Sequence, residues 1–370
     1  MAKTARSDRQ TPTRYRTGNP EVDRRLLELL AQVAPTDDRD QLWEILVSGV
    51  RLAADDADRL DLKITNAALK EMRNAFRMFA PYRDIPKVTI FGSARIDAGD
   101  PLYQQGRALA ELLADRGWMV VTGAGPGIMA AGLEGAGRER SIGVNIRLPF
   151  EQGANEFIAG DDKLISMKYF FTRKLMLMKE SRGFVSLPGG FGTLDETFEL
   201  LTLQQTGKAE PSPIVLLDEP GGGYWSGLVD FITEQVAAKG LIDSDDAGLF
   251  VVTDDVEEAC GAIVGFYRNF NSIRWVGDRM VIRLEAPPTD DELDDLNRRF
   301  ADVCLSGRIE RAEPLPAEVA NDDRLDKPRI VLAFDIFKQA RLRALIDALN
   351  ELGSAPPEAT PPPAQAQDID

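Results

Sequence analysis

The stretch GFVSLPGGFGTLDE, residues 183–196, joins a short apolar run to a glycine-rich turn and then to a helical pattern. The apolar run, residues 184–187, is typical of a strand that is buried on both faces of a sheet. Gly189, Gly190 and Gly192 allow the backbone to turn sharply and to lie close to a ligand. The helix that follows presents free N–H groups and a partial positive charge at its start. The stretch therefore predicts a phosphate-binding loop between a strand and a helix.

Two side chains in this stretch are candidates for chemistry. Thr193 can donate its hydroxyl to a phosphate or cap the helix. Glu196 is expected in the first turn of the helix, where the helix dipole keeps a carboxylate ionised. The structural alternative is a glycine turn followed by a capped helix whose first turn carries an acid.

Apolar runs and helical patterns alternate on both sides of this stretch. The runs are residues 87–91, 118–122, 141–146, 183–187, 213–217 and 249–252, and the helices are expected near 101–116, 126–138, 168–181, 193–206, 224–239 and 254–269. Continuous apolar strands with helices between them predict a parallel sheet that is covered on both faces. The expected fold class is α/β, a doubly wound, Rossmann-like domain over residues 85–270.

Other regions flank this predicted domain. Residues 19–84 carry apolar stripes at helical spacing, which predicts a helical extension, and residues 271–352 predict a small α+β domain. Residues 1–18 and 353–370 are polar or rich in Pro, Ala and Gln, and are predicted to be disordered. The small domain has no phosphate-type glycine loop and has a strongly anionic first helix. We therefore expect it to serve regulation or assembly and not catalysis.

Composition excludes several kinds of site. The 370 residues include no histidine, which excludes a Ser-His-Asp triad, a Cys-His dyad and every His-ligated metal. The two cysteines stand far apart, so no zinc site or disulfide framework is expected, as is typical of a reducing cytoplasm. The net charge of −16 repels nucleic acid and anionic membranes. With no signal peptide or transmembrane pattern, we expect a cytoplasmic protein without metal, redox cofactor, nucleic-acid or membrane partner.

Two further loops follow predicted strands. Gly92 and Ser93 follow the first strand, and the sequence TGAGPGIM, residues 122–129, follows the second. From Gly123 the spacing is G-x-G-x-G and not G-x-G-x-x-G, and no acid clearly ends the next strand, so an NAD site is not expected. Backbone contact with a nucleotide and a tight turn for packing both stay open for this loop. Because ligands bind at the carboxyl ends of the strands in such sheets, all three loops should line one crevice.

A pair of cations lies in the helix that precedes residues 183–196. Arg173 and Lys174 offer donors for a phosphate or for a leaving base. The alternative is that both are part of a solvated helix face.

Together these motifs resemble the Lonely-guy family of cytokinin-activating phosphoribohydrolases and bacterial nucleotide nucleosidases, often labelled lysine decarboxylases. The family pattern P-G-G-x-G-T-x-x-E is present in full and ends at Glu196. Arg173 and Lys174 match the family's Arg-Lys pair, and Arg173 precedes Glu196 by the family's 23 residues. The family's G-G-G-x-G-x-M loop is present with Ala124 at its middle glycine. The resemblance covers about residues 88–267 and is greatest to the longer bacterial branch.

The resemblance implies a hydrolase that cleaves the N-glycosidic bond of a nucleoside 5′-monophosphate. The substrate would be AMP-like or a cytokinin riboside monophosphate, and the products a free base and ribose 5-phosphate. Glu196 is the expected catalytic anion, because fixed negative charge stabilises an oxocarbenium-like state, and Arg173 would position the nucleotide or stabilise the leaving base. The expected substrate-binding residues are Gly92, Ser93, Gly123, Gly125, Gly127, Met129, Lys174, Gly189, Gly190, Gly192 and Thr193.

Two alternatives to this enzyme are open. A non-catalytic nucleotide-binding or carrier module could use the same fold, although the presence of both Arg173 and Glu196 favours catalysis. A pyridoxal-phosphate decarboxylase is less favoured, because nothing singles out a Schiff-base lysine. The family resemblance also predicts at least a homodimer, and the helices near 168–181 and 193–206 carry apolar residues on more than one face. The alternative is that the N-terminal helical segment buries these faces.

Overall fold

The computed structural model describes residues 14–33, 39–148 and 153–359. The chain divides into two compact units, Met1–Lys70 and Glu71–Asp370. The first unit contains α1 (Pro20–Gln32), α2 (Arg39–Ala54) and the beginning of α3 (Arg59–Phe79). Its small core is formed by Leu30, Trp43 and Val47.

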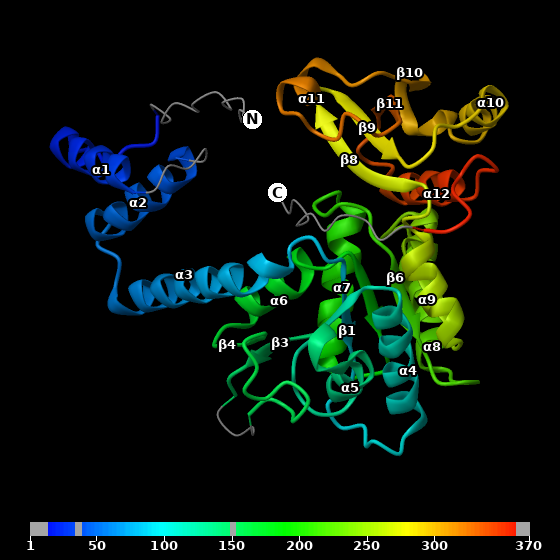
Figure 1. The fold of residues 1–370 in the computed structure, drawn as a ribbon, viewed down its shortest axis with the longest axis horizontal. Helices are drawn as coiled ribbons and strands as arrows, with labels where there is room; N and C mark the ends of the chain where they lie inside the picture. The colour runs from blue at the N-terminus through cyan, green and yellow to red at the C-terminus, as the bar shows by residue number, and fades with distance from the viewer. Residues whose placement is uncertain (1–13, 34–38, 149–152, 360–370) are drawn as a thin grey trace. The chain divides into compact units, whose positions relative to one another are not determined.

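The second unit is built on a parallel sheet of seven strands, some of which are labelled in Figure 1. The strands are β1 (Lys87–Phe91), β2 (Met119–Thr122), β3 (Ser141–Ile146), β4 (Leu164–Met167), β5 (Gly183–Ser186), β6 (Ile214–Leu217) and β7 (Val251–Thr253). They lie in the order β4-β3-β2-β1-β5-β6-β7, so the predicted doubly wound sheet is confirmed. The order reverses between β1 and β5, which is where ligands bind in such folds. The sequence did not reveal β4, a four-residue edge strand that is only partly buried.

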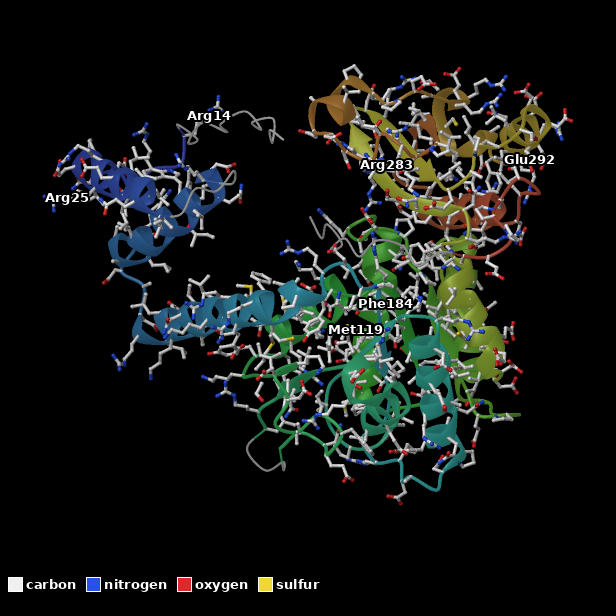
Figure 2. All side chains as sticks on the ribbon, in the orientation of Figure 1. Arg14, Arg25, Met119, Phe184, Arg283 and Glu292 are labelled. Atoms are coloured by element: carbon white, nitrogen blue, oxygen red, sulfur yellow. The ribbon has the colours of Figure 1, made fainter. Side chains whose placement is uncertain are left out.

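Helices cover both faces of this sheet because neighbouring residues of each strand point to opposite sides. The helices are α4 (Pro101–Asp115), α5 (Ile128–Arg140), α6 (Phe170–Lys179), α7 (Phe191–Gln205), α8 (Tyr224–Phe231) and α9 (Val256–Gly265). Val120 packs with residues of α4 and α9 in one core cluster. Met119 and Phe184 pack with residues of α6 and α7 in a second cluster, and Figure 2 labels both side chains inside this domain. The single helix expected near 224–239 ends at Phe231 and continues as π- and 3₁₀-type turns.

A smaller antiparallel sheet follows. Its strands are β8 (Phe270–Val276), β9 (Arg279–Leu284), β10 (Cys304–Arg311) and β11 (Arg329–Phe334), and its helices are α10 (Asp290–Arg299), α11 (Pro316–Ala320) and α12 (Gln339–Asn350). The strands lie in the order β10-β11-β9-β8. The sequence analysis placed no strand at residues 270–276, so β8 is an addition to the expected α+β domain.

The two sheets of the second unit share one hydrophobic core. The cluster that contains Val88 of β1 continues through Phe270 of β8 and Leu342 of α12. At the junction, the hydroxyl of Tyr267 donates to the carbonyl oxygen of Arg182 over 2.8 Å. The small domain therefore completes the core of the larger one.

Parts of both predicted disordered ends are in contact with the fold. The Trp43 indole N–H donates to the Tyr15 carbonyl over 2.8 Å, and Arg268 Nε donates to the Pro356 carbonyl over 2.6 Å. Ala355 is buried. Residues 1–13 and 360–370, which complete those two ends, lie outside the described residues. Within the described ranges, no helix has both the length and the apolar character needed to cross a membrane.

Candidate active site

Three loops meet at the carboxyl edge of the parallel sheet. Ser93, after β1, donates its backbone N–H to the carbonyl of Pro188, after β5, over 3.3 Å. Ser93 also accepts at its carbonyl from the N–H of Ile128, at the start of α5, over 3.0 Å. The loop after β1 is thus hydrogen-bonded to the loops after β2 and β5. The structure brings together the three glycine loops that the sequence assigned to one crevice.

Close packing explains several of the glycines. A Cβ at Gly92 would lie 2.6 Å from Ile128, and one at Gly127, whose φ is +66°, would lie 2.2 Å from the Ser93 carbonyl oxygen. A Cβ at Gly189 would lie 2.2 Å from Thr193 Oγ1. These three positions let the loops approach one another. A Cβ at Gly190 or Gly192 meets nothing within 4 Å, so both border open space.

The helix after the Pro-Gly-Gly turn begins earlier than the sequence suggested. Gly190 is the N-cap of α7, which starts at Phe191. Thr193 is therefore the third residue of the helix and is not its cap, and Glu196 lies in the second turn and not the first. Glycine needs no side chain to occupy the N-cap position, so the helix starts before the first residue that could cap it. The first-turn N–H groups remain available at the open end of α7.

The centre of the site is the pair formed by Glu196 and Arg173. Arg173 Nη1 lies 3.8 Å from Glu196 Oε1, and the two side chains are 10% and 13% exposed. Arg173 Nε donates to the carbonyl of Val144 over 2.9 Å, which orients the guanidinium. A Cβ at Gly123 would lie 1.9 Å from Arg173 Nη2, so only glycine leaves room for this arginine.

Met129 also depends on small neighbours in the loop after β2. A Cβ at Gly123 would lie 2.7 Å from Met129 Sδ, and one at Gly125 would lie 2.6 Å from Met129 Cε. Met129 therefore lies against both glycines, and Arg173 lies against Gly123. The structure places Met129, an expected substrate-binding residue, beside Arg173 of the candidate catalytic pair.

The carboxyl of Glu196 has an unusual affinity for protons. Burial raises the pKa of Glu196 to about 7, although the charge of Arg173 acts in the opposite direction. The neighbouring Asp195 adds to the increase. A carboxyl with a pKa near neutrality can both carry negative charge and accept a proton, which is the property required of an acid–base catalyst.

Lys174 is engaged away from the arginine–glutamate pair. Its Nζ lies 3.0 Å from Asp195 Oδ2 and also contacts Glu199, so it ties α6 to α7. Burial lowers the pKa of Lys174, but its two acidic partners outweigh that effect and raise it. The ammonium is thus held in its charged form within these ion pairs.

Two residues that hold the loops were missed from the sequence. The Tyr224 hydroxyl donates to the Gly189 carbonyl over 2.7 Å, and Asn155 Nδ2 donates to the Gly125 carbonyl over 2.9 Å. Neither belongs to a motif, because each reaches the site from a distant part of the chain. Among the described residues, no three cysteine, aspartate or glutamate side chains are grouped closely enough to hold a metal ion.

The fold is a doubly wound α/β domain, and the crevice at the carboxyl edge of its sheet holds the arginine–glutamate pair. A family model described as "Possible lysine decarboxylase" matches residues 127–263. A cytokinin riboside 5′-monophosphate phosphoribohydrolase of Mycobacterium marinum is 27% identical over 164 residues, which cover 44% of this chain and 84% of the relative. An Arabidopsis thaliana protein of the same name is 41% identical over 86 residues, 23% of this chain and 38% of the relative. These matches confirm the predicted resemblance to the Lonely-guy family.

A solved structure with a similar domain is the molybdenum cofactor carrier protein of Chlamydomonas reinhardtii. It is 24% identical, with a TM-score of 0.34, and the match covers 48% of this chain and 96% of that protein.

Proposed function

We propose that this protein hydrolyses the N-glycosidic bond of a nucleoside 5′-monophosphate, AMP or a cytokinin riboside monophosphate. The observation that carries the proposal is the buried Arg173–Glu196 pair at the edge where the three glycine loops meet. The names of the similar proteins support the same reaction class. The products are a free base and ribose 5-phosphate.

The phosphate end of the substrate binds at the start of α7. Gly190 and Gly192 border open space, and the N–H groups of the first helical turn lie beside them. A helix N-terminus of this kind favours an anion through its free donors and its dipole. The sugar then extends toward Glu196, one turn further along the helix.

Glu196 acts on the reacting carbon. Water adds to C1′, the bond from C1′ to the base nitrogen breaks with its electron pair going to the base, and one water proton ends on the base. Positive charge develops at the sugar in this step, and a fixed carboxylate stabilises it more than it stabilises the neutral ground state. With a pKa of about 7, Glu196 can also accept the proton of the attacking water.

Arg173 positions the nucleotide beside this carboxylate. Its guanidinium is fixed by the Val144 carbonyl and enclosed by Gly123. A fixed cation next to the base stabilises electron density that moves onto the base as it leaves. Met129 offers the base an apolar contact on the other side of the same glycine.

Exposed aromatic side chains around this site support a homodimer or larger homo-oligomer. Phe170 and Phe171 are each 54% exposed, and Phe191 is 93% exposed. Apolar groups of this size on a surface mark a binding face, and a second copy of the chain would cover them. Light scattering at micromolar concentration tests this, and a monomer would contradict it.

The activity is tested by incubating the purified protein with AMP, adenosine and a cytokinin riboside monophosphate, followed by chromatography of the free base. We expect release from the monophosphates and much slower release from adenosine, because the site at α7 binds the phosphate. Equal rates with AMP and adenosine would contradict the assigned phosphate site. Binding of AMP without release of adenine would instead identify a non-catalytic nucleotide-binding module.

A further inference from the structure

A large cavity lies at the opposite edge of the parallel sheet from the active site. Its volume is about 1040 Å³, at the upper limit of the usual size of small-molecule sites. One wall is residues 206–211, which link the end of α7 to β6, and Arg83, which precedes β1. The other wall comes from β8, β9 and α12 of the smaller domain. The cavity is thus bounded by both domains of the second unit.

Two cations that line the cavity have no partner of opposite charge among the described residues. Arg83 and Lys208 line it, are exposed and form no ion pair with another described residue. The acids that line it are already engaged. Glu210 accepts from Arg182 Nη1 over 2.9 Å, and Asp323 is paired with Arg274 and Arg283. In a chain with a net charge of −16, this is a local excess of cations.

A buried guanidinium, that of Arg182, is paired with Glu210 in the wall of the cavity. Arg182 is 2% exposed, and its Nε and Nη2 have no hydrogen-bond partner among the described residues. Burial lowers the pKa of nearby Arg324, and the charges of Arg182 and Arg283 lower it further. Figure 2 labels Arg283 on the smaller domain. Unsatisfied buried donors and mutually repelling guanidinium groups are stabilised when an anion binds near them.

An aromatic side chain is available beside these cations. Trp275 lines the cavity and is 45% exposed, and Phe334 supports it with a ring-centroid distance of 6.3 Å. An accessible indole next to arginine and lysine provides a stacking face for a planar ring. A simple inorganic anion would use the cations but would leave this face unused.

We propose that the cavity is a second binding site, for a nucleoside di- or triphosphate. The base stacks on Trp275, and the phosphates lie against Arg83 and Lys208 and share the charge of Arg274. Several cations around so large a space match a ligand with more than one phosphate. This site is distinct from the crevice of Glu196, so it stands even if the proposed hydrolysis is wrong.

Calorimetric titration of the full-length protein with ATP and with GTP tests the site. We expect at least one of them to bind, and Arg83→Ala combined with Lys208→Ala to weaken that binding at least tenfold. Both side chains are exposed, so the variant should fold. Arg279→Ala combined with Lys239→Ala removes the same charge from exposed positions outside the cavity and should leave binding unchanged. Arg173→Ala, which alters the active site, should also leave it unchanged.

The stacking contact is tested separately with tripolyphosphate. Trp275→Leu should weaken nucleotide binding about five- to hundredfold and leave tripolyphosphate binding unchanged, because only the nucleotide carries a ring. Absence of saturable ATP and GTP binding below 1 mM would overturn the proposal, as would loss of binding in Arg173→Ala. Unchanged nucleotide binding in Trp275→Leu would also overturn the assignment to a nucleotide.

Discussion

Two glutamates with little exposed surface, Glu318 and Glu196, contact arginine in different ways. In the smaller domain, Glu318 Oε1 accepts from Arg283 Nη2 over 2.7 Å and from Arg329 Nη1 over 2.6 Å. In the active site, Glu196 has Arg173 at 3.8 Å, beyond hydrogen-bond distance. The first carboxylate is surrounded by donors, and the second is held near one cation without a direct hydrogen bond to it.

The affinity of the two carboxyls for protons follows from this difference. Burial acts to raise the pKa of Glu318, but the Leu315 N–H and the two arginines outweigh it, and the pKa is lowered. Burial dominates at Glu196 and raises its pKa to about 7. The fully hydrogen-bonded carboxylate of Glu318 stabilises the fold. The carboxyl of Glu196, which lies in a crevice and has fewer partners, is available for catalysis. Each of the following changes tests that contrast.

The largest effect is expected from removing the carboxylate of Glu318, which is hydrogen-bonded to two arginines. Glu318→Gln removes the buried carboxylate that Arg283 and Arg329 share, which leaves Arg283 with Asp323 alone, and should lower the free energy of unfolding by about 3–5 kcal/mol. Urea unfolding followed by circular dichroism measures this. Glu310→Gln, at an exposed position of β10, is the control and should change stability by less than about 0.5 kcal/mol. A loss below about 1 kcal/mol in Glu318→Gln would contradict the structural role of the pair.

The corresponding change in the active site should reduce turnover and not the amount of folded protein. Glu196→Gln removes the fixed negative charge, and losing one preorganised electrostatic group costs about 10²–10³ in rate. Adenine release from AMP measures this. Asp195→Asn, on the same helix turn but 61% exposed in its side chain, is the matched control and should stay within about threefold of the unchanged protein. Turnover at the original rate in Glu196→Gln would remove this carboxyl from the mechanism.

Glu196→Gln should also stabilise the protein above neutral pH. The folded-state pKa of about 7 exceeds the ordinary 4.5, so the folded state binds more protons in this window and loses stability as the pH rises from about 4.5 to 7. Removing the acid should raise the free energy of unfolding by up to about 3 kcal/mol at pH 8 and by little at pH 4.5. Unfolding curves at the two pH values measure this. Equal effects at both would show that the pKa of Glu196 is not raised.

The pH dependence of turnover gives a milder test of the same group. If the ionised form of Glu196 is the active one, kcat at saturating AMP should rise about tenfold per pH unit below pH 7 and level off above it. Asp195→Asn should move the midpoint downward, since the Asp195 charge contributes to the raised pKa. A flat profile between pH 5 and 8 would be inconsistent with a catalytic carboxylate of this pKa.

The smallest effect is expected at an exposed ion pair. Arg298 Nη2 lies 2.8 Å from Asp295 Oδ1 on α10, with side chains 71% and 44% exposed. Asp295→Asn should change the free energy of unfolding by less than about 0.5 kcal/mol, because water screens such pairs. A loss comparable to that of Glu318→Gln would show that burial does not distinguish these pairs.

The sequence predicted most of the parallel sheet because its strands are continuous apolar runs between glycine-rich turns. It missed β4, an edge strand, and β8, which lies next to a domain boundary assigned from the change in strand and helix pattern. It also missed where α7 begins, since the N-cap is a glycine and carries no capping side chain. Local patterns define buried elements well and their ends poorly.

The sequence predicted those residues of the candidate site that belong to a recognisable motif. It did not predict the contacts that these residues make with the rest of the fold. The meeting of Arg173 with Glu196 could be expected from the family spacing, but the contact of Arg173 with the Val144 carbonyl could not. Ala124 shows the same limit. It occupies the family's glycine position with φ of +58°, a backbone conformation that glycine adopts easily and that the sequence alone does not reveal.

The shared core has a consequence for how the chain folds during synthesis. The cluster that begins at Val88 is completed by residues as distant as Leu349 and Ala355. Contacts across such long sequence separations form late, because loop closure must precede them. When only the parallel-sheet region has been synthesised, the apolar residues that later pack against the smaller domain are still exposed. Until the last helix emerges, these residues form a binding surface for chaperones and a point of vulnerability to aggregation.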